Sequence, residues 1–174
     1  MRILGIDPSL AGTGACVIDH DGTARVTTIG SRPVGSDVLD RYARVRRIAR
    51  DVTEWAGPVD AVVIEAPAYG SRQGQQHDRS GLWWLIVERV ATWTDTVIEV
   101  APTTRAKYAT GRGNAVKDEV LIAVVQRYQN VGISTNDEAD AVVLAHIGAR
   151  LLDEPRDDVP KSHLAALAKL EAAL

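Results

Sequence analysis

The chain has 174 residues, of which 45% are hydrophobic and 25% charged, and this balance fits one globular domain with a substantial core. It contains no apolar run of about 18 residues, so we expect no transmembrane helix, and a strand predicted at the very start leads us to expect no signal peptide. A single cysteine, Cys16, excludes an internal disulfide framework and a cysteine-rich zinc site, so we expect a cytoplasmic protein.

The first predicted strand ends in an acidic residue. Residues 3–6 are apolar apart from Gly5, as expected of a strand that is buried on both faces, and Asp7 follows them directly. Pro8 then ends the strand, and the glycine and hydroxyl residues behind it predict a turn. Asp7 either only begins that turn or serves a function at the strand end, because a buried charge needs a partner.

Two further strands and a long helix follow. Residues 14–19 and 24–29 read as strands, and the Asp21-Gly22 pair between them predicts a tight hairpin, so three antiparallel strands open the protein. Apolar residues then recur at three- and four-residue spacing over residues 37–55, which predicts an amphipathic helix. Ser36 is its predicted cap, and Gly57-Pro58 ends it.

A second buried strand also ends in a carboxylate. Residues 60–65 are mostly apolar, and Glu65 is followed closely by Pro67. A strand that is reached through a long helix is placed naturally beside the first strand and parallel to it. Because neighbouring strands lie about 4.8 Å apart, Asp7 and Glu65 are then expected to be close together. The carboxyl ends of the strands are where open α/β sheets place their sites.

The next helix, over residues 78–93, carries adjacent tryptophans. Trp83 and Trp84 cannot both face one side of a helix, so one face is expected to meet the sheet and the other a partner. We interpret this helix, around Leu82–Trp93, as the interface of a homodimer; the alternative is a helix buried wholly within one chain. A fifth strand over residues 96–101, a short helix over 102–108, a glycine-containing loop over 111–114 and a helix over 116–128 follow.

The last core helix, over residues 137–152, begins with two acidic residues. Asp137 and Asp140 lie on one face of its first turn, behind the predicted cap Thr135-Asn136. Acidic residues at a helix N-terminus favour the helix dipole and need no function, which is one interpretation. Asp140, however, precedes an apolar run and is expected to point inward, where a divalent cation is the simplest partner for it.

Four carboxylates are therefore expected to converge from two strand ends and a helix start. Oxygen ligands of this kind suit Mg²⁺, with Mn²⁺ as a substitute, and we predict two ions in the site. A pair of such ions about 3.5–4 Å apart activates water and stabilises the leaving oxygen in phosphodiester hydrolysis.

The ordered motifs resemble the RuvC Holliday-junction resolvases of the ribonuclease H-like superfamily, with cellular and phage-type members both left open. The matching pieces cover residues 1–152 and are Gly5-Ile6-Asp7-Pro8-Ser9 with Gly14, then Ile64-Glu65, then Gly111-x-Gly113-x-x-x-Lys117, and then Asp137-x-x-Asp140-Ala141. The resemblance implies an α/β fold with a five-stranded mixed sheet, three antiparallel and then two parallel strands, flanked by helices. Residues 1–152 would form the nuclease domain, and 153–174 a linker and a short C-terminal helix.

The resemblance also assigns roles to individual residues. It implies that Asp7, Glu65, Asp137 and Asp140 hold the metal ions, and that Lys117 and Lys107 contact phosphate near the scissile bond. The family has an aromatic residue in the loop after the glutamate that stacks on junction bases, and here the candidate is Tyr69. We expect further DNA contacts from the basic side chains Arg72, Arg105 and Arg112.

The net charge of −3 does not by itself favour nucleic acid, but the charges are segregated. Residues 72–117 hold seven basic and four acidic side chains, whereas the tail around 153–158 is acidic. We therefore predict a Mg²⁺-dependent endodeoxyribonuclease that nicks paired strands of four-way DNA junctions. No motif specifies a branch-migration helicase partner.

Three other functions remain as alternatives. The first is a nuclease with the same core that acts on flaps, forks or RNA, and the second is a branched-DNA-binding protein without catalysis. The third is a sugar-kinase or actin-like ATPase, because Asp7 with Thr13 and Gly14 is similar to the first phosphate loop of those proteins. The chain is too short for their second domain, which disfavours this last alternative.

Overall fold

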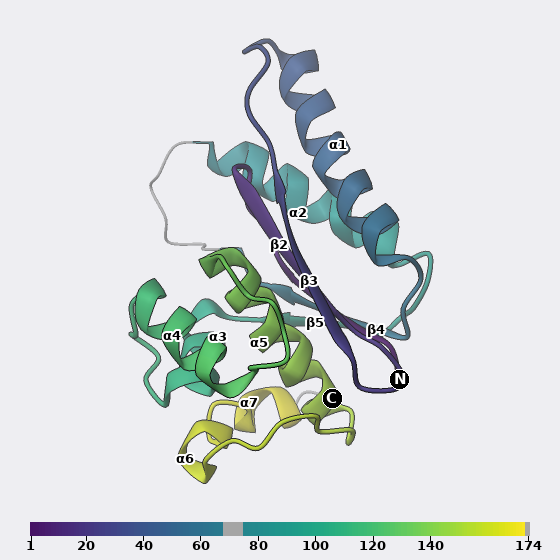
Figure 1. Ribbon diagram of the computed structural model, residues 1–174. Helices are drawn as coiled ribbons and strands as arrows, with labels where there is room; N and C mark the ends of the chain where they lie inside the picture. The colour runs from purple at the N-terminus through teal and green to yellow at the C-terminus, as the bar shows by residue number, and fades with distance from the viewer. Residues whose placement is uncertain (68–74, 173–174) are drawn as a thin grey trace.

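A computed structural model describes residues 1–67 and 75–172 (Figure 1). Its single sheet has the strand order β3-β2-β1-β4-β5. The strands are β1 (Ile3–Asp7), β2 (Gly12–Ile18), β3 (Ala24–Gly30), β4 (Ala61–Glu65) and β5 (Val97–Val100). The first three pair antiparallel, and β4 and β5 run parallel to β1. The predicted mixed sheet of three antiparallel and two parallel strands is therefore confirmed.

Helices cover both faces of this sheet (Figure 1). One face carries α1 (Val38–Ala56) and α2 (Gln76–Val90), and the opposite face carries the others. Those others are α3 (Pro102–Thr110), α4 (Lys117–Arg127), α5 (Asn136–Leu151), α6 (Lys161–Leu164) and α7 (Ala168–Glu171). In the described part of the chain, none of the helices has the length and apolar character that crossing a membrane requires.

The alternation of side chains along the strands divides the core into two clusters. Along β1, Leu4 and Ile6 contribute to the cluster under α1 and α2, whereas Ile3 contributes to the cluster under α5. The strands β1, β2 and β4 are buried along almost their whole length, which explains their nearly continuous apolar sequence.

Helix α5 lies unusually close to the sheet because two glycines sit beneath it. A Cβ atom at Gly5 would lie 2.3 Å from the carbonyl oxygen of Ala141, and one at Gly14 would lie 1.9 Å from that of Asp137. Both glycines therefore permit an approach that no other residue allows. This approach brings the first turn of α5 over the ends of β1 and β2, where Asp7 is located.

One of the two predicted helix caps is confirmed, and the other is wrong. Thr135 caps α5 as predicted, by accepting a hydrogen bond from the backbone N–H of Glu138, whose carboxylate accepts one from the Thr135 N–H in return. The prediction of Ser36 as the cap of α1 is wrong. Asp37 takes this role, because its carboxylate accepts a hydrogen bond from the N–H of Asp40.

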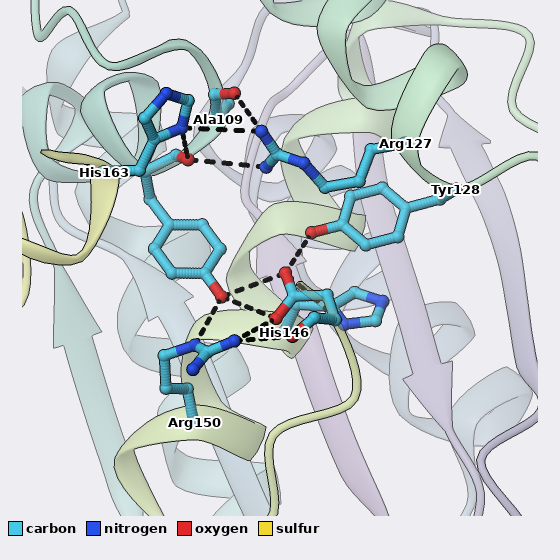
Figure 2. A network of polar contacts seen from close by, with 8 residues as sticks. Ala109, Arg127, Tyr128, His146, Arg150 and His163 are labelled. Carbon is cyan, nitrogen blue, oxygen red and sulfur yellow. Dashed lines mark hydrogen bonds and ion pairs between the residues drawn. The ribbon is translucent and has the colours of Figure 1, made fainter. Parts of the chain in front are cut away.

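The C-terminal segment is attached to the core by a buried polar network (Figure 2). The carboxylate of Asp157 accepts hydrogen bonds from the hydroxyls of Tyr108 and Tyr128 and from the guanidinium of Arg150. These hydrogen bonds keep the pKa of Asp157 below its ordinary value although burial acts in the opposite direction. Beyond this anchor, the single predicted C-terminal helix is replaced by α6 and α7, which flank a fully buried Leu167.

Candidate active site

The strand ends and the start of α5 enclose a cleft of about 330 Å³. Asp7 stands at the end of β1 and Glu65 at the end of β4, and the parallel pairing of these strands places them at the same edge of the sheet. Asp137 and Asp140 enter from the first turn of α5. All four predicted carboxylates therefore line one cleft, together with Lys117 and Arg105.

Hydrogen bonds hold the turn that follows Asp7. The hydroxyl of Thr13 donates a hydrogen bond of 2.7 Å to the carbonyl of Ser9 and accepts one from the Ser9 N–H. The guanidinium of Arg44 on α1 donates a hydrogen bond of 2.6 Å to the carbonyl of Leu10. These contacts fix the path of the chain as it leaves the strand, so the position of Asp7 is fixed as well.

Burial raises the pKa of the central carboxyl groups. The pKa of Asp7 rises to about 7, first through burial and then through the neighbouring Glu65 carboxylate. The pKa of Asp140 also rises to about 7, chiefly through burial, and those of Glu65 and Asp137 are raised by burial as well. A group of acids that is costly to ionise together is typical of a site that binds a cation or performs chemistry.

Arg105 is the main cation inside this group of acids. Its guanidinium forms ion pairs with the carboxylates of Glu65 and Asp140, and the Arg105 side chain is only 9% exposed. The sequence analysis predicted Arg105 as a phosphate contact, which stays a prediction; in the structure its guanidinium lies among the carboxylates. Among the described residues, no three acidic, histidine or cysteine side chains are grouped as the ligands of a metal ion.

The chemistry of the site nevertheless fits a hard divalent cation. The second carboxylate oxygen of Asp140, Oδ2, is buried and has no hydrogen-bond partner, which is unusual for a charged group. Asp137 lies against Gly12, where a Cβ atom would come within 2.7 Å of Oδ2 of Asp137. Oxygen donors in this number suit Mg²⁺ or Mn²⁺ better than softer metals.

The remaining predicted residues are distributed differently. Lys117 lies at the rim of the cleft, with Nζ 4.0 Å from Oδ1 of Asp137 and a side chain that is 66% exposed. Arg112 is not among the residues that line the cleft, and it pairs with Glu119 at 2.8 Å. Lys107, on α3, is partly exposed. Tyr69 and Arg72 lie outside the described residues.

Sequence reasoning missed the contribution of α2 to the cleft. Gln76, Arg79, Ser80 and Trp83 line it, and the Trp83 indole donates a hydrogen bond of 2.9 Å to the carbonyl of Glu65. The adjacent tryptophans offered the only signal: they were expected to face opposite ways, and Trp83 is indeed buried while Trp84 is 65% exposed. The hydrogen bond of Trp83 to the end of β4 fixes the backbone that carries Glu65.

Comparison with known proteins gives the family. No protein-family model matches the chain. The crossover junction endodeoxyribonuclease RuvC of Synechococcus sp. (strain CC9605) is 32% identical over 151 residues, which are 83% of this chain and 96% of that protein. RuvC of Rhodospirillum rubrum is 31% identical over 156 residues, 83% of this chain and 87% of that protein. The chain belongs to the RuvC family. Membership of this family implies a metal-dependent nuclease.

Solved structures of Holliday-junction resolvases, among them RuvC, show the same fold. Thermus thermophilus RuvC superposes with a TM-score of 0.62 at 17% identity, over 98% of this chain and 96% of that chain. The T. thermophilus RuvC complex with a Holliday junction substrate gives a TM-score of 0.60 at 20% identity, over 88% and 97%. The yeast mitochondrial resolvase Ydc2 gives 0.53 at 11% identity, over 99% of this chain and 82% of that chain. The predicted ribonuclease H-like fold is thus confirmed.

Proposed function

We propose that the protein is a metal-dependent endonuclease that resolves Holliday junctions by paired nicking of phosphodiester bonds. The observation that carries this proposal is the meeting of Asp7, Glu65, Asp137 and Asp140 in one cleft of a RuvC-family fold. The names of the relatives support the reaction, since they are crossover junction endodeoxyribonucleases.

We further propose that these four carboxylates hold two Mg²⁺ ions, for which Mn²⁺ can substitute. The buried, unpartnered Oδ2 of Asp140 and the costly ionisation of Asp7 support a cation at this place. When bound, such ions supply an activated water and stabilise the charge that develops at the scissile phosphate.

The chain's own residues would orient the DNA at the mouth of the cleft. Lys117 is exposed at the rim and can meet a phosphate without leaving its place near Asp137. Arg79 and Ser80 of α2 also line the cleft and are available as further phosphate contacts. Contacts of this kind give binding that weakens steeply with salt. Roles for Tyr69, Arg72, Lys107 and Arg112 in DNA binding belong to the same proposal.

A homodimer through α2 also belongs to this proposal, because paired nicks need two sites. Leu82 is fully buried within the chain, whereas Trp84 on the opposite face of α2 is largely exposed, as are Leu39 and Tyr42 on the neighbouring α1. Large exposed apolar side chains on two neighbouring helices favour an interface. Sedimentation of Trp84→Glu should shift from dimer to monomer, whereas wild-type mass equal to one chain would contradict the dimer.

A cleavage panel tests the function directly. Labelled four-way junction, flap, fork and RNA–DNA hybrid are each incubated with the protein in Mg²⁺ and in EDTA. We expect paired nicks in the junction in Mg²⁺ and no cleavage in EDTA. Preferred cleavage of flaps, forks or hybrid would favour the alternative nuclease, and junction binding without cleavage would favour a DNA-binding protein. The bacterial cytoplasm, or a phage-infected host cell, is the proposed place of action.

A further inference from the structure

The guanidinium of Arg105 occupies oxygen atoms that a metal ion would need. Its Nε donates a hydrogen bond to Oε2 of Glu65, and its Nη1 donates one to Oδ1 of Asp140. Both are charge-assisted hydrogen bonds, which are the strong kind, and the three side chains are at most 13% exposed. Two of the four proposed metal ligands are therefore already engaged by a cation of the chain itself.

Arg105 is placed there by the fold rather than by a flexible side chain reaching in from the surface. It lies in the first turn of α3, which begins at Pro102 directly after β5, and β5 pairs with β4 so that Val100 is opposite Glu65. Among the described residues, Arg105 is the only arginine or lysine that is buried. Lys117, another basic side chain near these acids, is mostly exposed.

The charges in the site explain why a resident cation is needed. Two buried carboxylates, Asp7 and Asp140, and the nearly buried Glu65 line one cleft, and leaving them without a cation would be costly. A guanidinium offers five donors in a planar fork and can serve two carboxylates at once, which an ammonium group does less well. Arg105 thus offsets part of this negative charge while no divalent ion is bound.

We propose that Arg105 is the counter-ion of the metal-free site and competes with the divalent cation for Glu65 and Asp140. Binding of the ion then requires Arg105 to release these carboxylates. The released guanidinium lines the cleft and becomes available to a phosphate, so metal loading and DNA binding favour each other. This inference rests on the proposed metal-dependent function.

The competing interpretation is that Arg105 orients the ligands and so assists metal binding. The two interpretations predict opposite changes in metal affinity. If Arg105 competes, its removal frees two carboxylate oxygens and the affinity rises. If it orients the ligands, its removal disorders them and the affinity falls.

The test measures Mn²⁺ affinity by isothermal titration calorimetry, without DNA, for wild type, Arg105→Met and Arg105→Lys. Arg50→Met is the matched control, because it removes the same charge from an exposed position on α1 that does not line the cleft. We expect Arg105→Met to bind Mn²⁺ at least tenfold more tightly than wild type, Arg105→Lys to be intermediate, and the control to change less than twofold.

Thermal unfolding supplies a second readout that does not depend on activity. In EDTA, Arg105→Met should melt at a lower temperature than wild type, because the carboxylates lose their counter-ion, and Mn²⁺ should raise its Tm by more than it raises that of wild type. If Arg105→Met does not fold, Arg105→Lys carries the same comparison.

Two results would overturn the inference, and they differ. If wild type binds Mn²⁺ and the Arg105 variants bind it equally or more weakly, the competition is refuted while the metal-dependent function stands. If none of the proteins binds Mn²⁺ at millimolar concentration, the proposed metal-dependent function fails and the inference fails with it.

Discussion

Replacing Asp7 with asparagine should stabilise the metal-free protein at neutral pH while it abolishes cleavage. The Asp7 side chain is buried at the end of β1, and its pKa is raised from 3.8 to about 7 by burial and by Glu65. At a pH well above 7, this rise in pKa means that the ionised Asp7 destabilises the folded state by at most about 4 kcal/mol. Since the amide of asparagine is still a buried polar group, we expect a net gain of about 1–3 kcal/mol.

The pH dependence follows from the same rise in pKa. The folded protein holds the Asp7 proton more tightly than the unfolded chain does, so between about pH 4 and pH 7 the folded state binds more protons. Its stability therefore falls as pH rises through this window, and the contribution of Asp7 is most unfavourable above pH 7. The advantage of Asp7→Asn should be large at pH 8 and close to zero at pH 4.

Urea denaturation in EDTA at pH 8 and at pH 4 measures this advantage, with junction cleavage in Mg²⁺ as the second assay. At pH 8, thermal unfolding should show the same gain as a Tm that is about 2–12 °C higher for a chain of this size. Asp158→Asn, which removes an exposed acid, is the control and should change neither stability nor cleavage. Equal stability of Asp7→Asn and wild type at both pH values would refute the reasoning.

Three further predictions concern other parts of the molecule. Gly14→Ala should destabilise the fold by more than about 3 kcal/mol in urea denaturation, because the alanine Cβ would lie 1.9 Å from the Asp137 carbonyl oxygen. An unchanged urea midpoint would contradict the close approach of α5 to the sheet. Asp157→Asn should cost about 3 kcal/mol, because a buried carboxylate with hydroxyl and guanidinium donors is lost, whereas Asp158→Asn should cost nothing measurable. The affinity for Mg²⁺, measured by calorimetry, should weaken as pH falls below about 7. The carboxyl groups of Asp7 and Asp140 have a pKa near 7 and must lose their protons before an ion binds. An affinity that does not change with pH would contradict this.

The sheet and the position of the acidic cluster could be predicted because each rests on a short-range rule. A buried strand that ends in Asp7, and a second that ends in Glu65 after a long helix, predict parallel neighbours with their carboxyl ends at one edge. The register of β1 with β4 agrees with this, since Ile6 is paired with Ile64. The inward direction of Asp140 followed in the same way from the apolar run behind it.

The position of Arg105 could not be predicted from spacing. A basic residue on a short helix is exposed in most proteins, and only the placement of α3 against the end of β5 directs this side chain toward Glu65. One signal was present in the sequence. Arg105 lies in the first helical turn after β5, and that turn begins close to the edge of the sheet that carries the carboxylates.

The position of Asp157 in the C-terminal segment could not be predicted from the sequence either. The acidic tail suggested a linker, but the donors that bury its carboxylate come from α3, the end of α4 and α5. Partners that distant in the chain depend on the tertiary structure. The boundary between residues 1–152 and 153–174 stays a prediction, while Val159 and Leu167 beyond it pack into the core cluster under α5.

The central claim is that the carboxylates at the strand ends cleave junction DNA with the help of a divalent cation. The measurement that tests it most directly follows a labelled four-way junction with wild type and Asp7→Asn, each in Mg²⁺ and in EDTA. The account predicts paired nicks for wild type in Mg²⁺ only, with retained junction binding by Asp7→Asn. Cleavage by Asp7→Asn at the wild-type rate, or by wild type in EDTA, would contradict it.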